Sequence, residues 1–298
     1  MAIETDKVYQ VWRGCAVGRL GWFALPLLVT LYAAGAQAEG DDELVAAINQ
    51  YRLEPQGCVA RQTTALGPLA PNPELARERV STAAQLQSAL QQAGYQPAAA
   101  QVVAVSGPSS REAALAALKQ RYCAILLDPQ YAEVGVRRDG NTWQVILARP
   151  LLPRDLGDWP QAGREILQRV NEARGETRRC GSQVFDAALP LTWSEALAEA
   201  SLNHSRDMAK HNYFSHQGKD GNLAGKRATR VGYRWQAIGE NIAAGQGSAK
   251  QVVAGWLASP AHCFNVMNPD FTEMGAAYAL NPQSDAAIYW TQVFGTPR

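Results

Sequence analysis

The feature that most constrains the fold of this 298-residue chain is an internal repeat with a cysteine at each end. Residues of the first half recur in the second half in the same order. The interval is 122 positions at first, then 138, 140 and 147, so it only grows, as insertions in one copy require. We therefore predict two copies of one domain. The matched pairs include Asn49 with Asn171, Arg52 with Arg174, Cys58 with Cys180, Tyr95 with Tyr233, Cys123 with Cys263, Gly135 with Gly275, and Trp143 with Trp290.

The first 38 residues have the order of a secretory signal peptide. Arg13 and Arg19 precede an uncharged apolar run at 21–34, and Ala36-Gln37-Ala38 supplies the small residues of a cleavage site. The run is shorter than the roughly 20 apolar residues that span a bilayer. Cleavage after Ala38 is therefore favoured over an uncleaved anchor. We expect an exported protein, periplasmic or released, with no membrane span after cleavage.

The remaining chain divides at a segment rich in proline and glycine. The expected organisation is a signal peptide at 1–38, a first domain at 39–150, a linker at 151–163 and a second domain at 164–298.

Composition excludes two classes of protein. Hydrophobic residues make up 47% and charged residues 18%, which is typical of a globular chain and not of a disordered one. Lys and Arg number 28 against 27 Asp and Glu, so no basic surplus points to nucleic acid as a partner.

Cysteine usage predicts two disulfides. Signal cleavage removes Cys15 and leaves an even number of cysteines in an oxidising compartment. Four cysteines allow three pairings. The repeat favours closure within each copy, Cys58–Cys123 and Cys180–Cys263, and bridges between the copies are the alternative.

Periodicity in the second copy predicts an α+β fold, with helices layered on a mainly antiparallel sheet. Helices are expected at 164–174, after a capping box at Thr192 and Glu195, and after a second box at Ser248 and Gln251. Strands are expected at 274–280 and 286–294.

The candidate functional residues are His216, Glu240 and His262. Two imidazoles and one carboxylate match the ligands of a catalytic zinc site, and the same groups can do acid–base chemistry without a metal. The first copy has Ala100 or Val102 opposite Glu240 and Tyr122 opposite His262. His204, on an apolar helix face, and His211, near the helix end, are expected to be structural.

Four motifs in the second copy resemble the CAP superfamily, also called the SCP or PR-1-like family, which includes cysteine-rich secretory proteins, antigen 5 and plant pathogenesis-related 1 proteins. The secreted bacterial branch is the most similar. The resemblance covers about 160–298, and the first copy matches only through the second, as a degenerate CAP-like domain. The motifs are Tyr213-Phe214-Ser215-His216, Gly239-Glu240-Asn241-Ile242-Ala243, Trp256-x-x-Ser259-Pro260-x-His262 and Tyr289-Trp290-Thr291-Gln292-Val293-Phe294.

The resemblance implies an α-β-α sandwich with two His and two Glu in a shallow cavity. His216, Glu240 and His262 match three of these positions, whereas the usual second Glu, three residues after Trp256, is Ser259. Some members bind a divalent cation such as zinc through the two His, so His216 and His262 are the implied metal ligands. Others bind sterols or lipids, and proteolytic activity has been claimed for a few.

We expect a non-catalytic, extracytoplasmic binding module whose cavity at His216, Glu240 and His262 holds a divalent cation or a polar ligand. Its partner would be a polar ligand, a lipid or a component of the envelope or cell wall. The alternatives are a metal- or His/Glu-dependent hydrolase acting on peptide or cell-wall material, and a lipid or sterol carrier. The incomplete set of four cavity residues and the absence of a G-x-S-x-G nucleophile motif favour the binding module.

Overall fold

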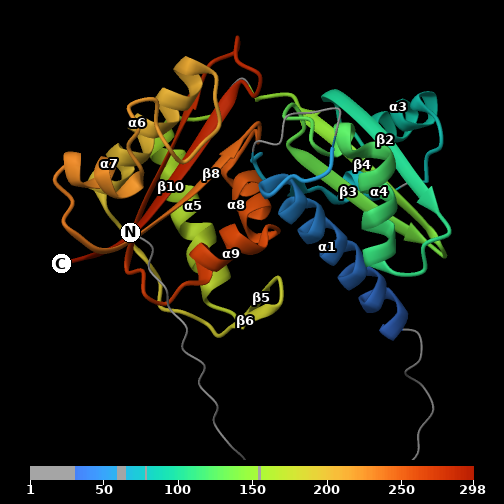
Figure 1. Ribbon diagram of the computed structural model, residues 1–298, viewed down its shortest axis with the longest axis horizontal. Helices are drawn as coiled ribbons and strands as arrows, with labels where there is room; N and C mark the ends of the chain where they lie inside the picture. The colour runs from blue at the N-terminus through green and yellow to red at the C-terminus, as the bar shows by residue number, and fades with distance from the viewer. Residues whose placement is uncertain (1–30, 59–64, 78, 154–155) are drawn as a thin grey trace, which may run out of the picture.

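The computed structural model describes residues 31–58, 65–77, 79–153 and 156–298, which form two α+β halves lying side by side (Figure 1). Most of the expected signal peptide, residues 1–30, lies outside the described residues. The remainder falls in helix α1 (Leu31–Leu53), which contains the expected cleavage site at Ala38. In the described part of the chain, no helix is both long enough and apolar enough to cross a membrane.

The first half is built on a four-stranded sheet in the order β1-β3-β4-β2. Helices α1 and α4 cover one face of this sheet, and the shorter α2 and α3 pack on the other. The elements after α1 are β1 (Ala70–Pro71), α2 (Pro73–Ala76), α3 (Ala83–Gln92), β2 (Pro97–Ser106), α4 (Arg111–Leu126), β3 (Glu133–Asp139) and β4 (Thr142–Pro150).

The second half is likewise a four-stranded sheet between two layers of helices, with the strand order β7-β9-β10-β8. Helices α6 and α7 lie on one face of its sheet, and α5, α8 and α9 lie on the other (Figure 1). This confirms the predicted α+β class. The elements are α5 (Trp159–Arg174), β5 (Arg178–Cys180), β6 (Gln183–Phe185), β7 (Thr192–Trp193), α6 (Glu195–His211), α7 (Ala224–Arg230), β8 (Trp235–Ala244), α8 (Ala249–Leu257), α9 (Pro260–Met267), β9 (Glu273–Leu280) and β10 (Ile288–Pro297).

Matched residues occupy matched positions in the two sheets. Each sheet has a short strand that pairs in parallel, with Ala70 opposite Glu133 in one and Thr192 opposite Glu273 in the other. On the edge strands, Val102 pairs with Ile146 and Glu240 pairs with Val293. Ile146 and Val293 are 147 positions apart, which is the same interval as between the matched residues Trp143 and Trp290. Val102, and not Ala100, therefore occupies the position of Glu240.

Each half contains its own disulfide, Cys58–Cys123 and Cys180–Cys263, as expected from the repeat. No bridge joins the two halves among these four cysteines.

The capping residues show that the expected starts of helices α5 and α6 were wrong. Helix α5 begins at Trp159 because the Asp158 side chain accepts a hydrogen bond from the Gln161 amide, so part of the expected linker at 151–163 is helical. Thr192 does not cap α6, because it lies in strand β7 and Ser194 accepts from the Leu197 amide instead. The prediction for α8 is confirmed, with Ser248 accepting from the Gln251 amide.

The strand predictions hold with one shift. Strand β9 covers the expected residues, whereas β10 begins at Ile288 and not at Ala286. The preceding residue, Ala287, has a φ of 62°, which is incompatible with an extended strand.

Candidate functional site

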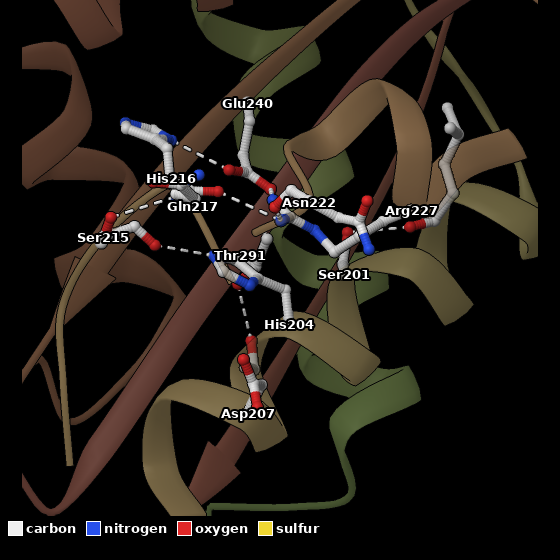
Figure 2. A network of polar contacts seen from close by, with 12 residues as sticks. Ser201, His204, Asp207, Ser215, His216, Gln217, Asn222, Arg227, Glu240 and Thr291 are labelled. Atoms are coloured by element: carbon white, nitrogen blue, oxygen red, sulfur yellow. Dashed lines mark hydrogen bonds and ion pairs between the residues drawn. The ribbon is translucent and has the colours of Figure 1, made fainter. Parts of the chain in front are cut away.

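The candidate site is organised around a buried carboxylate on the edge strand β8. Glu240 Oε1 lies 2.9 Å from His216 Nδ1, and Glu240 Oε2 accepts a hydrogen bond of 2.6 Å from Arg227 Nη2 (Figure 2). His216 comes from the loop after α6, and Arg227 comes from α7. The Glu240 side chain is 3% exposed, whereas that of His216 is 46% exposed. The carboxylate is therefore held inside the domain and the imidazole is presented at its surface.

The surroundings of Glu240 keep it ionised. Burial raises the pKa of this carboxyl, but the hydrogen bond with His216 and the nearby positive charges outweigh burial, so the net pKa lies below its ordinary value. An ionised carboxylate only accepts hydrogen bonds, so the proton of a neutral His216 is on Nδ1. This leaves Nε2, on the side of the ring away from Glu240, with its lone pair free to accept a hydrogen bond.

Arg227 also fixes the backbone beside the imidazole. Its Nη1 donates to the carbonyl oxygens of His216 at 3.1 Å and Asn222 at 2.6 Å. One guanidinium therefore orients both the carboxylate and the loop that carries His216. The sequence analysis missed this residue. The only signal for it is indirect: a buried Glu in a polar motif needs a cationic partner.

His262 is not part of this hydrogen-bonded pair in the described residues. It lies on α9, is buried, and its Nδ1 is 2.7 Å from the hydroxyl of Ser259. Burial, with a smaller contribution from the charge of His216, lowers the pKa of His262 to about 3, so the ring is neutral at physiological pH. Ser259, three residues after Trp256, thus holds the His262 ring through this contact.

The other two histidines lie outside the pair formed by Glu240 and His216. The buried His204 on α6 has its Nε2 2.9 Å from the carbonyl oxygen of Ser215. His211, in the last turn of α6, has its Nδ1 2.8 Å from the carboxylate of Asp207.

The donor set does not fit a zinc ion held by His216 and His262. Both oxygens of Glu240 are already engaged, and the adjacent guanidinium of Arg227 offsets the negative charge that a divalent cation needs. Structural and catalytic zinc sites use at least three protein ligands. Across the described residues, no group of three or more His, Cys, Asp and Glu side chains is arranged to hold a metal ion.

Two curated relatives, both from Bacillus subtilis (strain 168), match part of the chain. The uncharacterized protein YkwD is 34% identical over 105 residues, which is 35% of this chain and 39% of the relative. The uncharacterized membrane protein YlbC is 36% identical over 85 residues, which is 28% of this chain and 25% of the relative. The chain thus spans well under half the length of either relative.

Solved structures similar to the chain include two bacterial proteins. An extracellular protein containing an SCP domain from Bacillus anthracis str. Ames has 25% identity and a TM-score of 0.39, covering 52% of each chain. A cysteine-rich secretory protein from Staphylococcus aureus has 14% identity and a TM-score of 0.37, covering 52% of this chain and 50% of that one.

The match to a family model is confined to the second half. Residues 167–294 match the model of the Cysteine-rich secretory protein family, CAP. These residues include His216, Glu240 and His262, and the strands of the second sheet as far as Phe294 in β10. The chain is therefore a protein with a CAP domain at residues 167–294.

Proposed function

We propose that the CAP domain is an exported, non-catalytic binding module that takes a polar ligand at His216. The observation that carries this proposal is the chain of contacts from Arg227 to Glu240 to His216, which fixes a half-exposed imidazole in one orientation and one tautomer. Its Nε2 is then prepared to accept a hydrogen bond from a hydroxyl or amide of the ligand. Export is supported by the two disulfides, which persist in oxidising compartments.

The same geometry favours a polar ligand over a cation. Arg227 supplies the positive charge that a bound cation would otherwise supply to Glu240, and a second cation beside it would be repelled. A polar ligand needs no such charge balance.

A hydrolase is the second candidate, and one observation favours it. A histidine oriented by a carboxylate through Nδ1 is the base-and-orienter pair of general-base catalysis. In the described residues, however, no Ser, Thr or Cys side chain is hydrogen-bonded to His216 Nε2, so the attacking group would have to be water. No observation on the described residues favours the lipid carrier.

Binding to a soluble digest of bacterial cell wall, which contains both glycan and peptide, tests the proposal. His216→Ala should weaken binding at least tenfold in calorimetry. His211→Ala is the matched control, because His211 is also a half-exposed imidazole held by a carboxylate through Nδ1, but it lies outside the site. Equal affinity of all three proteins, or no binding by any, would refute a ligand site at His216.

Two further arms separate the alternatives. If the wild type binds zinc and the double variant His216→Ala, His262→Ala does not, the ligand of the site is a metal ion and not a polar molecule. Cleavage of the digest that is lost in Glu240→Gln would establish a hydrolase instead of a binding module.

We also infer that the first half is a degenerate copy of the CAP domain that serves as a scaffold. This is supported by the common strand order and by the register of Val102, which pairs with Ile146 as Glu240 pairs with Val293. Tyr122 stands at the sequence position that corresponds to His262. Ligand binding should therefore be unaffected by Val102→Ala.

A further inference from the structure

A groove with a volume of about 770 Å³ lies where the two halves meet. Helices α1 and α4 of the first half form one wall, the β5–β6 hairpin of the second half forms the other, and α8 and α9 lie between them (Figure 1). His216, Glu240 and His262 are not among the residues that line it. Ligand sites commonly have volumes of about 300–1,000 Å³ and often lie between domains, so the groove has the size and the position of a ligand site.

The two walls of the groove carry opposite charges. The first wall has three carboxylates and one guanidinium, whereas the second has two guanidinium groups. Across the described residues, no ion pair joins one wall to the other, so each wall keeps its own net charge. The groups are Asp42, Glu43, Glu112 and Arg111 on the first wall, and Arg178 and Arg179 on the second.

Asp42 and Arg179 are the charged groups most available to a ligand. Both residues are exposed, and neither forms an ion pair or a side-chain hydrogen bond within the part of the chain that the structure describes. Arg111, by contrast, is already paired with Glu43 and Glu112. Charges at a protein surface act over about 8 Å at physiological ionic strength. A ligand in the groove therefore meets a negative charge at one wall and a positive charge at the other.

The floor between the walls is apolar. Its side chains are partly buried, so part of their surface can contact a ligand. Gln50 and Ser182 are the neutral hydrogen-bonding side chains of the lining, which is few for a molecule with many hydroxyl groups. The floor therefore suits an apolar segment better than a sugar. The apolar residues include Ala46, Ala47, Leu115, Ala254, Leu257 and Pro260.

Covalent and polar contacts hold both walls in place. Arg179 directly precedes Cys180, whose disulfide with Cys263 ties β5 to α9. On the other side, Asn49 of α1 donates a hydrogen bond of 3.1 Å to the carbonyl oxygen of Ala258, at the end of α8. A preformed site loses less conformational entropy when a ligand binds, so the separation of the charges is a property that can select a ligand.

We propose that this groove binds a short peptide with free ends, whose ammonium group lies towards Asp42 and whose carboxylate lies towards Arg179, with its apolar side chains on the floor. An internal segment of a longer chain lacks both terminal charges. The two charges of a single amino acid are one carbon apart, whereas the walls are too far apart to pair with each other. The site is separate from the proposed function at His216.

Calorimetry on the whole protein at low ionic strength tests the proposal, with tetra-alanine as the probe. Acetylation of its N-terminus removes the positive charge, and amidation of its C-terminus removes the negative charge. The wild type should bind the free peptide saturably, and at least tenfold more tightly than either capped form.

Charge reversal on each wall assigns the two ends of the peptide. Asp42→Lys should lose the preference for the free N-terminus and keep the preference for the free C-terminus, and Arg179→Glu should do the opposite. Glu199→Lys and Arg121→Glu are the matched controls, because they make the same charge changes at exposed positions outside the groove. Both controls should keep the two preferences of the wild type.

A variant of the floor tests the location without a change of charge. Ala47→Leu partly fills the groove and should weaken binding of free tetra-alanine at least tenfold. Binding that is unchanged in this variant, equal binding of the free and capped peptides, or no binding by the wild type would overturn the proposal. Equally tight binding of alanine itself would change the ligand from a peptide to an amino acid.

The experiment separates failure here from failure of the proposed function. His216→Ala should bind tetra-alanine as the wild type does. Binding of the cell-wall digest is compared with and without His216→Ala in the Asp42→Lys background, where the groove no longer attracts free N-termini. Digest binding that depends on His216, without tetra-alanine binding, would remove only the groove, and the reverse pattern would remove only the site at His216.

Discussion

At the scale of single residues, two completely buried arginines, Arg52 and Arg174, each bond with several backbone carbonyl oxygens. Arg174 donates to the carbonyl oxygens of Leu189, Val266, Asn268 and Phe271. Arg52 makes the matched set of contacts in the first half, to Gly67, Leu126, Asp128 and Tyr131. A guanidinium has five N–H donors in a fixed plane, so one side chain can satisfy carbonyls that converge from several segments. Each arginine thus ties a helix to the chain around its disulfide.

We predict that Arg174→Met strongly destabilises the protein. Methionine fills much of the volume but leaves four carbonyls without a donor, which should lower the free energy of unfolding by at least about 3 kcal/mol. Urea unfolding at pH 7 measures this. The control is Arg169→Met, which removes a partly exposed ion pair with Glu165 and should cost less than about 1 kcal/mol. Similar losses in the two variants would contradict the role given to Arg174.

The buried His262 predicts how stability depends on pH. Its folded-state pKa of about 3 lies below the ordinary value of 6.5, so the unfolded chain binds more protons between these two values. Stability is therefore lost as pH falls below 6.5, and the loss levels off near pH 3. At about 1.4 kcal/mol per pH unit, this residue alone should lower the free energy of unfolding by about 2 kcal/mol between pH 6.5 and 5.

Urea unfolding at several pH values checks this dependence. His262→Gln should flatten the profile between pH 6.5 and 5. A profile that keeps its slope in His262→Gln would show that another group causes the acid sensitivity. His204, whose pKa is also lowered by burial, should contribute in the same direction.

Sequence reasoning found part of the site for identifiable reasons. His216 and Glu240 each lie in a short motif that is recognisable from the sequence, and the structure brings the two side chains together. Arg227 has no such motif, because its contact with Glu240 depends on how α7 packs against β8. The burial of His262 was equally invisible, since a histidine in a helix can face either the core or the solvent.

At the scale of elements, strand β9 approaches helix α6 closely at a glycine. A Cβ atom on Gly275 would lie 2.0 Å from the backbone nitrogen of Ala198. The matched glycine of the first half, Gly135, approaches α2 in the same way, with 2.4 Å between its Cβ position and Leu75 Cβ. Both glycines are therefore required for helix–sheet contact and not for backbone conformation.

We predict that Gly275→Ala prevents normal packing of α6. The added methyl group would overlap the helix backbone, which cannot rotate away, so the cost should be at least about 3 kcal/mol or the variant should not fold. Circular dichroism and urea unfolding measure the loss. Gly175→Ala is the control, because its Cβ would lie 3.4 Å from the nearest atom and its φ of −68° suits alanine. Full stability of Gly275→Ala would refute the close approach.

Element boundaries were less predictable than the elements themselves. Ser248 was identified correctly as a cap because only one side chain stands at the right spacing before α8. Before α6, Thr192 and Ser194 are both residue types that can cap a helix. Thr192 pairs with β9, which leaves Ser194 as the cap. That pairing joins residues 81 positions apart, so local sequence does not contain it.

At the scale of the whole molecule, the two halves meet through polar contacts that are buried or partly buried. Gln246 is fully buried and donates to the carbonyl oxygen of Pro68 at 2.7 Å. Asn49 donates to the Ala258 carbonyl at 3.1 Å, and Gln251 bonds with the buried Glu133. Domains joined by a small, wet interface move independently. Here the side chain of Gln246 is fully buried between the halves, so the two halves should behave as one unit.

We therefore predict that the oxidised protein unfolds in a single calorimetric transition. Gln246→Ala removes the donor to Pro68 and leaves a cavity between the halves, which should cost about 1–3 kcal/mol and uncouple them into two transitions. Gln168→Ala is the control, because Gln168 is exposed on α5 and its side chain bonds with Glu172 of the same helix, so its variant should keep the single transition. Two separate transitions in the wild type would mean that the interface does not couple the halves, and that the first half is an appended domain and not a scaffold.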